Sequence, residues 1–471
     1  MFGGIARRAA SALGVSAVTI ALAGAPVANA TTAASYAGTT ADGGTWIADV
    51  PSPWNGTLLL YSHGFGPPLA ADAPDPTTKQ ALLDRGYALA GSSYDPNGSW
   101  WALNSALSDQ FQTLSDVEQD LPSPPEHVIA LGTSMGGLIS SLEAERAAGR
   151  IAGSLTTCGI VAGGIQLNNY QLDGEYAMSR LLAANEPIKL VNFTGPPDGL
   201  HTGQQLDAIA QEAQMTLPGR ARLALAMAFM NVSTWAAGEP MPAAGEYATQ
   251  EQEQYDVQFK PAGPPPLSTT MDFVEFARPY IEQAAGGNGS WTKGVDFARL
   301  FAESSYAPEV MSLYRAAGLD LRRDLETLTR DANIAADPDA IRSLVRTSVP
   351  TGRLQVPELD MHTISDQLVP VQHENYYLHT VQRAGARQLL RQAFIERQLH
   401  CNFTPAELVA GVLAVHQRIE RHHWGNVAEP GRLEATATSL GLGDAAFIPY
   451  EPAPLSGDNG PFSPDISRTW R

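Results

Sequence analysis

Short apolar segments alternate with amphipathic segments in two parts of the chain. Each apolar segment has the length of a buried strand, and each amphipathic segment has helical spacing. This alternation is typical of parallel strands joined by helices that cover both faces of the sheet, so the sequence predicts an α/β fold. The predicted strands are residues 57–62, 87–92, 128–131, 153–159, 354–362 and 389–395. The predicted helices are residues 78–85, 101–121, 137–146 and 375–385, and a further helix follows Thr404.

The middle of the chain has a different pattern, with helical segments and proline-rich loops but no convincing strand. A helical insertion between two halves of a sheet is most simply a lid over the carboxyl ends of the strands, and a separate helical domain of unrelated role is the alternative. The helical candidates are residues 206–215, 220–230, 271–285 and 308–333. The predicted organisation is a first core part at 31–165, a lid at 166–350, a second core part at 351–425 and an irregular C-terminal tail at 426–471.

The first 30 residues are expected to be a signal peptide. Arg7 and Arg8 precede an apolar run at 9–25, and residues 28–30 form an A-x-A cleavage site. The run is short for a membrane span. We therefore expect a secreted or extracytoplasmic protein without stable membrane insertion, and a retained N-terminal anchor is the alternative.

Charge and cysteine content narrow the possible partners. The chain has 30 basic and 49 acidic residues and a formal net charge of −19, so no basic stripe is available for nucleic acid. Its two cysteines, Cys158 and Cys401, are too few for a zinc site. In an exported protein such an even pair more often forms a disulfide than remains as thiols.

Residues 132–136, Gly-Thr-Ser-Met-Gly, fit the pattern G-x-S-x-G between a predicted strand and a predicted helix. A serine on such a sharp turn is the nucleophile elbow, whereas an ordinary tight turn is the alternative. Glycine is expected at positions 132 and 136 for a steric reason, because Cβ atoms beside the strained serine would clash. The helix start directs N–H groups and partial positive charge at an oxyanion formed on Ser134.

A serine nucleophile needs a base, and the base needs an acid to orient it. Asp366 is the best acid, because it lies in a loop after the strand that ends near residue 363. A turn-forming aspartate is the alternative interpretation of this residue. Asp360 competes from inside the strand pattern, and Glu358 competes less well.

His400 is the best candidate among the ten histidines for the base. It follows the last predicted strand and precedes a helix that Thr404, Pro405 and Glu407 are expected to cap. His362, by contrast, lies within a strand pattern. The resulting chain order is serine, then acid, then histidine.

Backbone donors for an oxyanion are expected on two loops. Residues 63–66, His-Gly-Phe-Gly, follow the strand at 57–62, which we interpret as the third strand of the sheet. We assign the donors as the N–H groups of Phe65 and Met135. His63 is expected to brace this loop rather than to take part in catalysis.

These motifs together resemble the α/β-hydrolase superfamily of serine hydrolases. The resemblance covers residues 40–165 and 350–425 and matches the helical middle by position only. It implies hydrolysis through an acyl-enzyme without a metal or organic cofactor, usually of an ester.

A partial likeness to the tannase and feruloyl esterase branch concerns a disulfide between a cysteine beside the serine and one beside the histidine. Here His400-Cys401 fits, but Thr133 precedes the serine. Cys158 could still reach Cys401 and fix the histidine loop to the sheet.

The predicted substrate is a neutral or apolar ester of small to medium size. An acyl pocket could be lined by apolar residues that could equally pack the lid on the core, namely Trp100, Trp101, Phe229, Met230 and Trp235.

An amidase or peptidase that uses the same catalytic triad is the main alternative. Recognition of a free amine would need acids such as Glu246, Glu251 and Glu253, which look more like a solvated surface run. A binding protein with an inactive hydrolase fold is disfavoured, because no position of the triad is missing.

Overall fold

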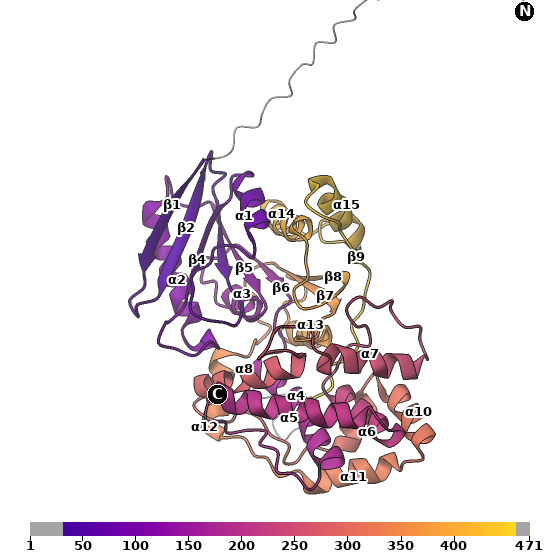
Figure 1. Ribbon diagram of the computed structural model, residues 1–471. Helices are drawn as coiled ribbons and strands as arrows, with labels where there is room; N and C mark the ends of the chain where they lie inside the picture. Colours follow the sequence, from indigo (N-terminus) through magenta and orange to yellow (C-terminus); the bar gives the residue numbers. More distant parts are fainter. Residues whose placement is uncertain (1–31, 458–471) are drawn as a thin grey trace, which may run out of the picture.

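The computed structural model describes residues 32–457, so the predicted signal peptide at 1–30 lies outside the described residues. Its centre is a nine-stranded sheet of order β1-β2-β4-β3-β5-β6-β7-β8-β9 (Figure 1). The strands are β1 (Thr32–Thr39), β2 (Thr45–Ser52), β3 (Thr57–Ser62), β4 (Ala88–Ser92), β5 (His127–Thr133), β6 (Gly153–Thr157), β7 (Glu358–Ser365), β8 (Leu390–Gln398) and β9 (Phe447–Ile448). Strands β3 to β8 pair in parallel with one another. Strands β1, β2 and β9 pair antiparallel at the two edges of the sheet. The expected α/β-hydrolase fold, with a mainly parallel sheet, is confirmed.

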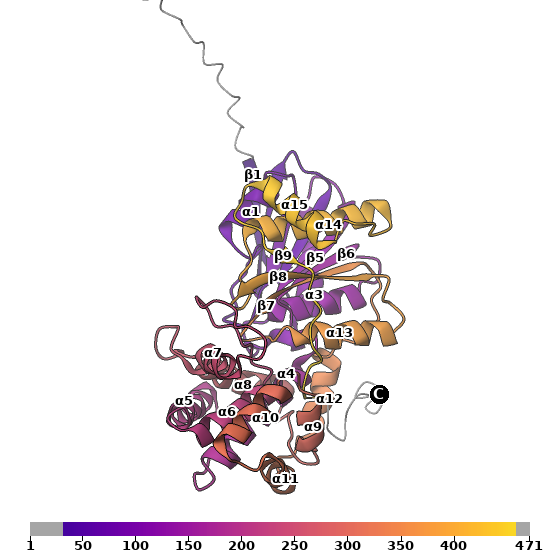
Figure 2. The same cartoon turned by 90° about the vertical axis from the view of Figure 1, so that its right-hand side faces the viewer.

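Helices cover both faces of the sheet, because its central strands carry apolar side chains on both sides. In β3, Leu58 and Leu60 pack on one face and Leu59 on the other, and all three are fully buried. The helices α1 (Pro76–Leu83), α14 (Pro405–Arg421) and α15 (Pro430–Leu440) lie on one face, and α2 (Ala106–Asp120), α3 (Met135–Glu145) and α13 (Gln372–Arg383) lie on the other (Figure 2).

A helical region forms a second lobe below the sheet in Figure 1. It contains α4 (Gly164–Leu182), α5 (Pro196–Ala213), α6 (Leu217–Phe229), α7 (Tyr247–Phe259), α8 (Thr270–Ala285), α9 (Phe297–Glu303), α10 (Ala307–Ala317), α11 (Leu321–Asp331) and α12 (Pro338–Thr347). One continuous apolar cluster joins this region to helix α3, since it includes Met135 and Leu138 of α3 together with Phe229 and Phe297. The helical region is therefore packed firmly against the start of α3.

Three sequence predictions are corrected by these elements. The tail is not wholly irregular, because residues 430–440 form α15, whose Leu433 and Ala437 join the apolar cluster around α14. The single helix expected at 308–333 is two helices, α10 and α11, because Gly318 adopts a φ of 66° and ends α10. The strand expected from residue 354 begins at Glu358. Within residues 32–457, no helix is long and apolar enough to cross a bilayer.

Candidate active site

The turn from β5 into α3 places Ser134 in a backbone conformation that non-glycine residues rarely adopt, with φ 60° and ψ −121°. Two glycines make this turn possible. A Cβ atom on Gly132 would lie 1.9 Å from the carbonyl oxygen of Gly136, and one on Gly136 would lie 1.8 Å from that of Ser62. The spacing of the G-x-S-x-G motif is thus a steric requirement of the strand–turn–helix connection.

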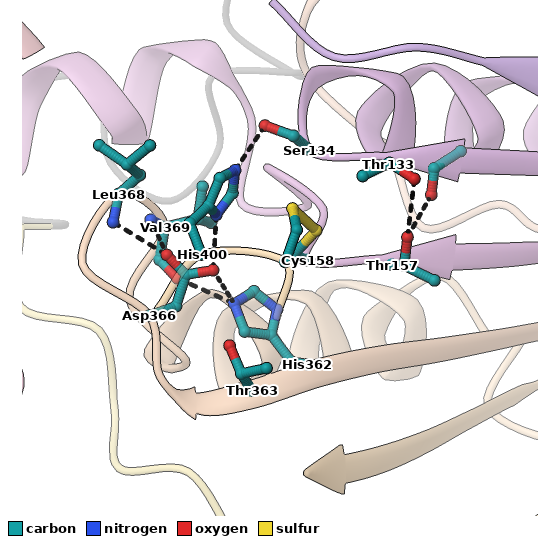
Figure 3. The surroundings of a disulfide bond; sticks show 12 residues. Thr133, Ser134, Thr157, Cys158, His362, Thr363, Asp366, Leu368, Val369 and His400 are labelled. Atoms are coloured by element: carbon teal, nitrogen blue, oxygen red, sulfur yellow. Dashed lines mark hydrogen bonds and ion pairs between the residues drawn. A yellow bond between two sulfur atoms is a disulfide. The ribbon is translucent and has the colours of Figure 1, made fainter. Parts of the chain in front are cut away.

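Ser134, His400 and Asp366 lie in one hydrogen-bonded line (Figure 3). His400 Nε2 is 2.8 Å from Ser134 Oγ, and His400 Nδ1 is 2.6 Å from Asp366 Oδ2. An ionised carboxylate only accepts hydrogen bonds, so Nδ1 carries a hydrogen and Nε2 is free to accept the serine proton. The three side chains come from the β5–α3, β7–α13 and β8–α14 connections, at the carboxyl ends of parallel strands.

Asp366 is fully buried, and its carboxylate is held from several sides. Oδ1 accepts the N–H groups of Leu368 at 2.9 Å and Val369 at 2.8 Å. Burial alone would raise the pKa of Asp366, but His400, His362 and the N–H of Val369 outweigh burial and hold this pKa below its usual value. Asp366 is therefore ionised at neutral pH.

The competing acids point elsewhere. Glu358 accepts the hydroxyl of Ser141 at 2.9 Å, and Asp360 lies beside Glu374 and Gln392. Burial raises the pKa of Glu358 to about 8 and that of Asp360 well above its ordinary value. Both are buried on β7, where burial favours the neutral form of the carboxyl, and Asp366 is the acid that reaches His400.

The loop that carries His400 is fixed by several links. A disulfide joins Cys401 to Cys158 at the end of β6, with the two Cα atoms 5.3 Å apart, so the predicted bond is confirmed. The N–H of His400 donates to Gln367 Oε1 at 2.7 Å. The hydroxyl of Thr363 donates to the carbonyl oxygen of Leu399 at 3.0 Å.

The two loops expected to hold an oxyanion meet at Ser134. A Cβ atom on Gly64 would lie 3.3 Å from the Cβ of Ser134, so glycine lets this backbone come close. Met135 is the first residue of α3, where an N–H has no partner within the helix. His63 donates from Nδ1 to the carbonyl of Gly64 at 2.8 Å and stacks on Tyr94. Burial lowers the pKa of His63 and keeps it neutral.

A cavity of about 380 Å³ opens over Ser134 and His400. Its walls come from the loops at the carboxyl ends of the strands and from helices α4 and α8. Apart from Ser134, His400, Thr133 and Gln171, its lining side chains are apolar. The lining residues are Gly64, Phe65, Trp101, Thr133, Ser134, Ile160, Leu167, Gln171, Phe273, Val274, Ala277, Ile281, Leu368, Val369, His400 and Cys401.

Of the aromatic and methionine side chains suggested for this pocket, Trp101 lines it. Phe229 and Met230 are buried in the apolar cluster of the helical region. Trp100 stacks on Tyr280 with ring centroids 4.8 Å apart, and Trp235 borders a separate cavity. The sequence did not identify Gln171, because the helix that carries it was not predicted.

The acids considered for amine recognition lie away from the cavity. Glu251 is fully buried and pairs with Arg220, and Glu253 accepts the N–H of Ala236 at 3.0 Å. The prediction of a solvated surface run is thus wrong for Glu251 and Glu253. Their polar partners explain why they can be buried.

Comparisons with known proteins show similarity to an amidase, an esterase and a peptidase. No family model matches the chain. An o-phthalyl amidase of Xanthobacter agilis is 27% identical over 458 residues, which cover 91% of this chain and 95% of the relative. Among solved structures, feruloyl esterase B of Aspergillus oryzae matches with a TM-score of 0.41 and 12% identity, covering 82% of this chain and 80% of that chain. An acylaminoacyl peptidase of Pyrococcus horikoshii matches with a TM-score of 0.35 and 9% identity, covering 90% of this chain but 43% of that chain.

Proposed function

We propose that the protein is a serine hydrolase that cleaves carboxylic acyl derivatives through an acyl-enzyme on Ser134. The observation that carries this proposal is the hydrogen-bonded line of Ser134, His400 and Asp366 at the mouth of an apolar cavity. His400 takes the serine proton while Oγ forms a bond to the substrate carbonyl carbon, and returns it to the leaving group when the old acyl bond breaks. A water molecule then releases the acid by the same proton transfers.

The negative charge on the substrate oxygen would be stabilised by the N–H groups of Phe65 and Met135. The close approach of Gly64 to Ser134 and the start of α3 at Met135 support this assignment. Losing one such donor typically lowers turnover by about 100- to 1,000-fold.

The cavity favours a neutral acyl group. Among the described residues, no lysine, arginine or acidic side chain lines it, and Phe65, Trp101 and Phe273 supply aromatic walls. Gln171 offers an amide that could hydrogen-bond to a neutral polar substituent. We therefore propose an ester of small to medium size with an apolar or aromatic acyl group.

Amide cleavage is the second candidate, and the o-phthalyl amidase relative supports it because the similarity extends over nearly the whole of both chains. The same three residues can cleave amides. A phthalyl group carries a carboxylate, for which the described lining offers no lysine or arginine. A free amine would find no acid in the same lining, which disfavours an aminopeptidase.

We also propose that residues 1–30 direct the chain out of the cytoplasm and that residues 164–347 act as a lid. The disulfide supports an oxidising compartment. The contribution of α4 and α8 to the cavity walls supports the lid, because these helices close the space above Ser134.

Matched p-nitrophenyl esters and p-nitroanilides of acetyl, butyryl, benzoyl and phthalyl groups test this proposal. We expect the neutral acyl esters to be cleaved and Ser134→Ala to abolish turnover and labelling by a fluorophosphonate. Anilide cleavage at comparable rates would establish the amidase. Full activity of Ser134→Ala would overturn the proposed function.

A further inference from the structure

A second histidine lies directly beside the acid of the active site. His362 is on β7, its side chain is fully buried, and its Nε2 lies 3.6 Å from Asp366 Oδ2 (Figure 3). The same Nε2 lies 2.8 Å from the carbonyl oxygen of Val369, and Nδ1 lies 2.8 Å from Oε1 of Glu374 on α13. His362 therefore links the turn that holds Asp366 to the helix that follows this turn.

These contacts determine how many protons His362 and Glu374 hold together. A carbonyl oxygen only accepts, so Nε2 of His362 carries a hydrogen that it donates to Val369. The hydrogen bond between Nδ1 of His362 and Oε1 of Glu374 then requires one further proton, which either atom can hold. If Nδ1 holds it, a positive imidazolium faces a carboxylate, and if Glu374 holds it, a neutral ring faces a carboxylic acid. Only the first arrangement presents a positive charge to Asp366.

The surroundings of the pair favour the charged arrangement. The ring lies between two carboxyl groups, and Glu374 Oε2 also accepts a hydrogen bond from Gln392 Nε2 at 2.7 Å. Burial opposes ionisation, since it raises the pKa of Glu374 to about 7. The ionised Asp366, however, lies on the opposite side of the ring and stabilises the positive charge.

Two further groups near the pair carry no charge that would compete. Burial favours the neutral form of Asp360 of β7, because it raises the pKa of that carboxyl well above its ordinary value. Burial and the nearby His362 lower the pKa of His373 on α13 to about 3, so His373 is neutral. Glu358 of β7 also faces Glu374, and it too is buried. His400 meets His362 through their shared partner Asp366.

We propose that His362 is a positioning residue whose positive charge, balanced by Glu374, keeps Asp366 ionised and sets the basicity of His400. The inference rests on the proposed function, because His362 acts through Asp366. A cation near the active site disfavours protonation of His400. Removing the cation at position 362 should therefore make His400 easier to protonate. The acidic limb of the dependence of kcat/KM on pH should then move to higher pH.

Two conservative variants separate charge from structure. In His362→Gln the side-chain amide can still donate to Val369 but cannot carry the charge. We expect His362→Gln to move the acidic limb upward by about half a pH unit or more, because it removes the cation. Glu374→Gln removes the negative partner and leaves the ring in place, so it should not move the limb upward. His379→Gln, at an exposed position of α13, is the matched control and should leave the limb in place.

The protonation of His362 can also be read without activity, by NMR of protein labelled with ¹⁵N in its histidines. We expect one buried ring, identified by its through-space contacts, to have both nitrogens protonated at pH 8, and its signals to be absent in His362→Gln. A neutral His362 in the wild-type spectrum would overturn the inference, and it would do so even if neither variant folds.

An acidic limb that stays in place in His362→Gln would also overturn the inference, even if stability or kcat fell, because a purely structural role predicts only those losses. The proposed function would still stand in either case, provided that Ser134→Ala is inactive. Full activity of Ser134→Ala would instead contradict the proposed function, and the NMR result would be unaffected by it.

Discussion

At the scale of single residues, the geometry distinguishes two aspartates that are six positions apart. Asp366 accepts a hydrogen bond from His400, whereas Asp360 is buried inside β7, where burial raises the pKa of its carboxyl and favours the neutral form. We expect Asp366→Asn to lower kcat by about 10⁴-fold, because an amide would favour the wrong tautomer of the histidine. Asp360→Asn replaces a neutral acid by a group of the same shape, so its kcat should stay within a few-fold of wild type. Hydrolysis of a p-nitrophenyl ester by the two variants checks both expectations, and a mild effect of Asp366→Asn would contradict the assignment.

The sequence was sufficient to select Ser134, Asp366 and His400, because each of them follows a predicted strand. Asp360 was set aside because it falls inside the strand pattern, and the structure places it within β7. The roles of His362 and Glu374 could not be inferred in the same way. Their contact joins β7 to α13, and no local pattern in either element indicates that the other supplies a partner.

At the scale of elements, the disulfide connects the end of β6 to the loop before α14. Its cysteines are 243 positions apart, and the chain-entropy model gives such a long loop about 5 kcal/mol of stabilisation. The double variant Cys158→Ala/Cys401→Ala should therefore unfold at a lower temperature. Its kcat should also fall, because His400 directly precedes Cys401. Thermal unfolding and ester hydrolysis measure the two effects, and an unchanged kcat would show that Gln367 and Thr363 suffice to hold the loop.

Helix α8 should determine the size of the acyl group. Ala277 lines the cavity, so Ala277→Leu would fill part of its volume of about 380 Å³. We expect kcat/KM for the longest accepted acyl chain to fall by about 10-fold or more, while acetyl esters are affected less. Gln283→Leu, at an exposed position of the same helix, is the control. A uniform loss across all chain lengths would indicate a general disturbance rather than a filled pocket.

The helical elements were the least predictable part of the fold. The sequence pattern does not identify the segments that form α4, α7, α9 and α12. For α4 and α7 one reason is that their buried faces contain polar residues. Glu251 and Glu253 on α7, for example, are buried with polar partners that come from distant positions in the chain. Hydrophobic periodicity detects a helix that packs with apolar side chains, and it misses one whose buried acids are paired by tertiary contacts.

At the scale of the whole molecule, buried carboxyl groups should make stability depend on pH in an unusual direction. Burial is the main cause that raises the pKa of Glu309 and of Glu358 to about 8. In the unfolded chain the ordinary value is about 4.3, so between these values the folded protein binds more protons. The free energy of unfolding therefore falls as pH rises through this range.

The buried His373 changes the free energy of unfolding in the opposite direction, but over a lower range of pH. His373 has a folded pKa of about 3, so it adds stability as pH rises only up to about 6.5, where the unfolded histidine is neutral. Above pH 6.5, the buried carboxyl groups determine how the free energy of unfolding changes with pH. The formal net charge of −19 acts in the same direction, since repulsion grows as more acids ionise.

We therefore expect the free energy of unfolding, measured by urea denaturation, to be lower at pH 8 than at pH 6.5. Each buried carboxyl contributes up to about 1.4 kcal/mol per pH unit. Glu309→Gln should flatten the slope, because it removes one such group, whereas the exposed Glu326→Gln should leave the slope unchanged. A free energy of unfolding that rises from pH 6.5 to 8 would contradict this account.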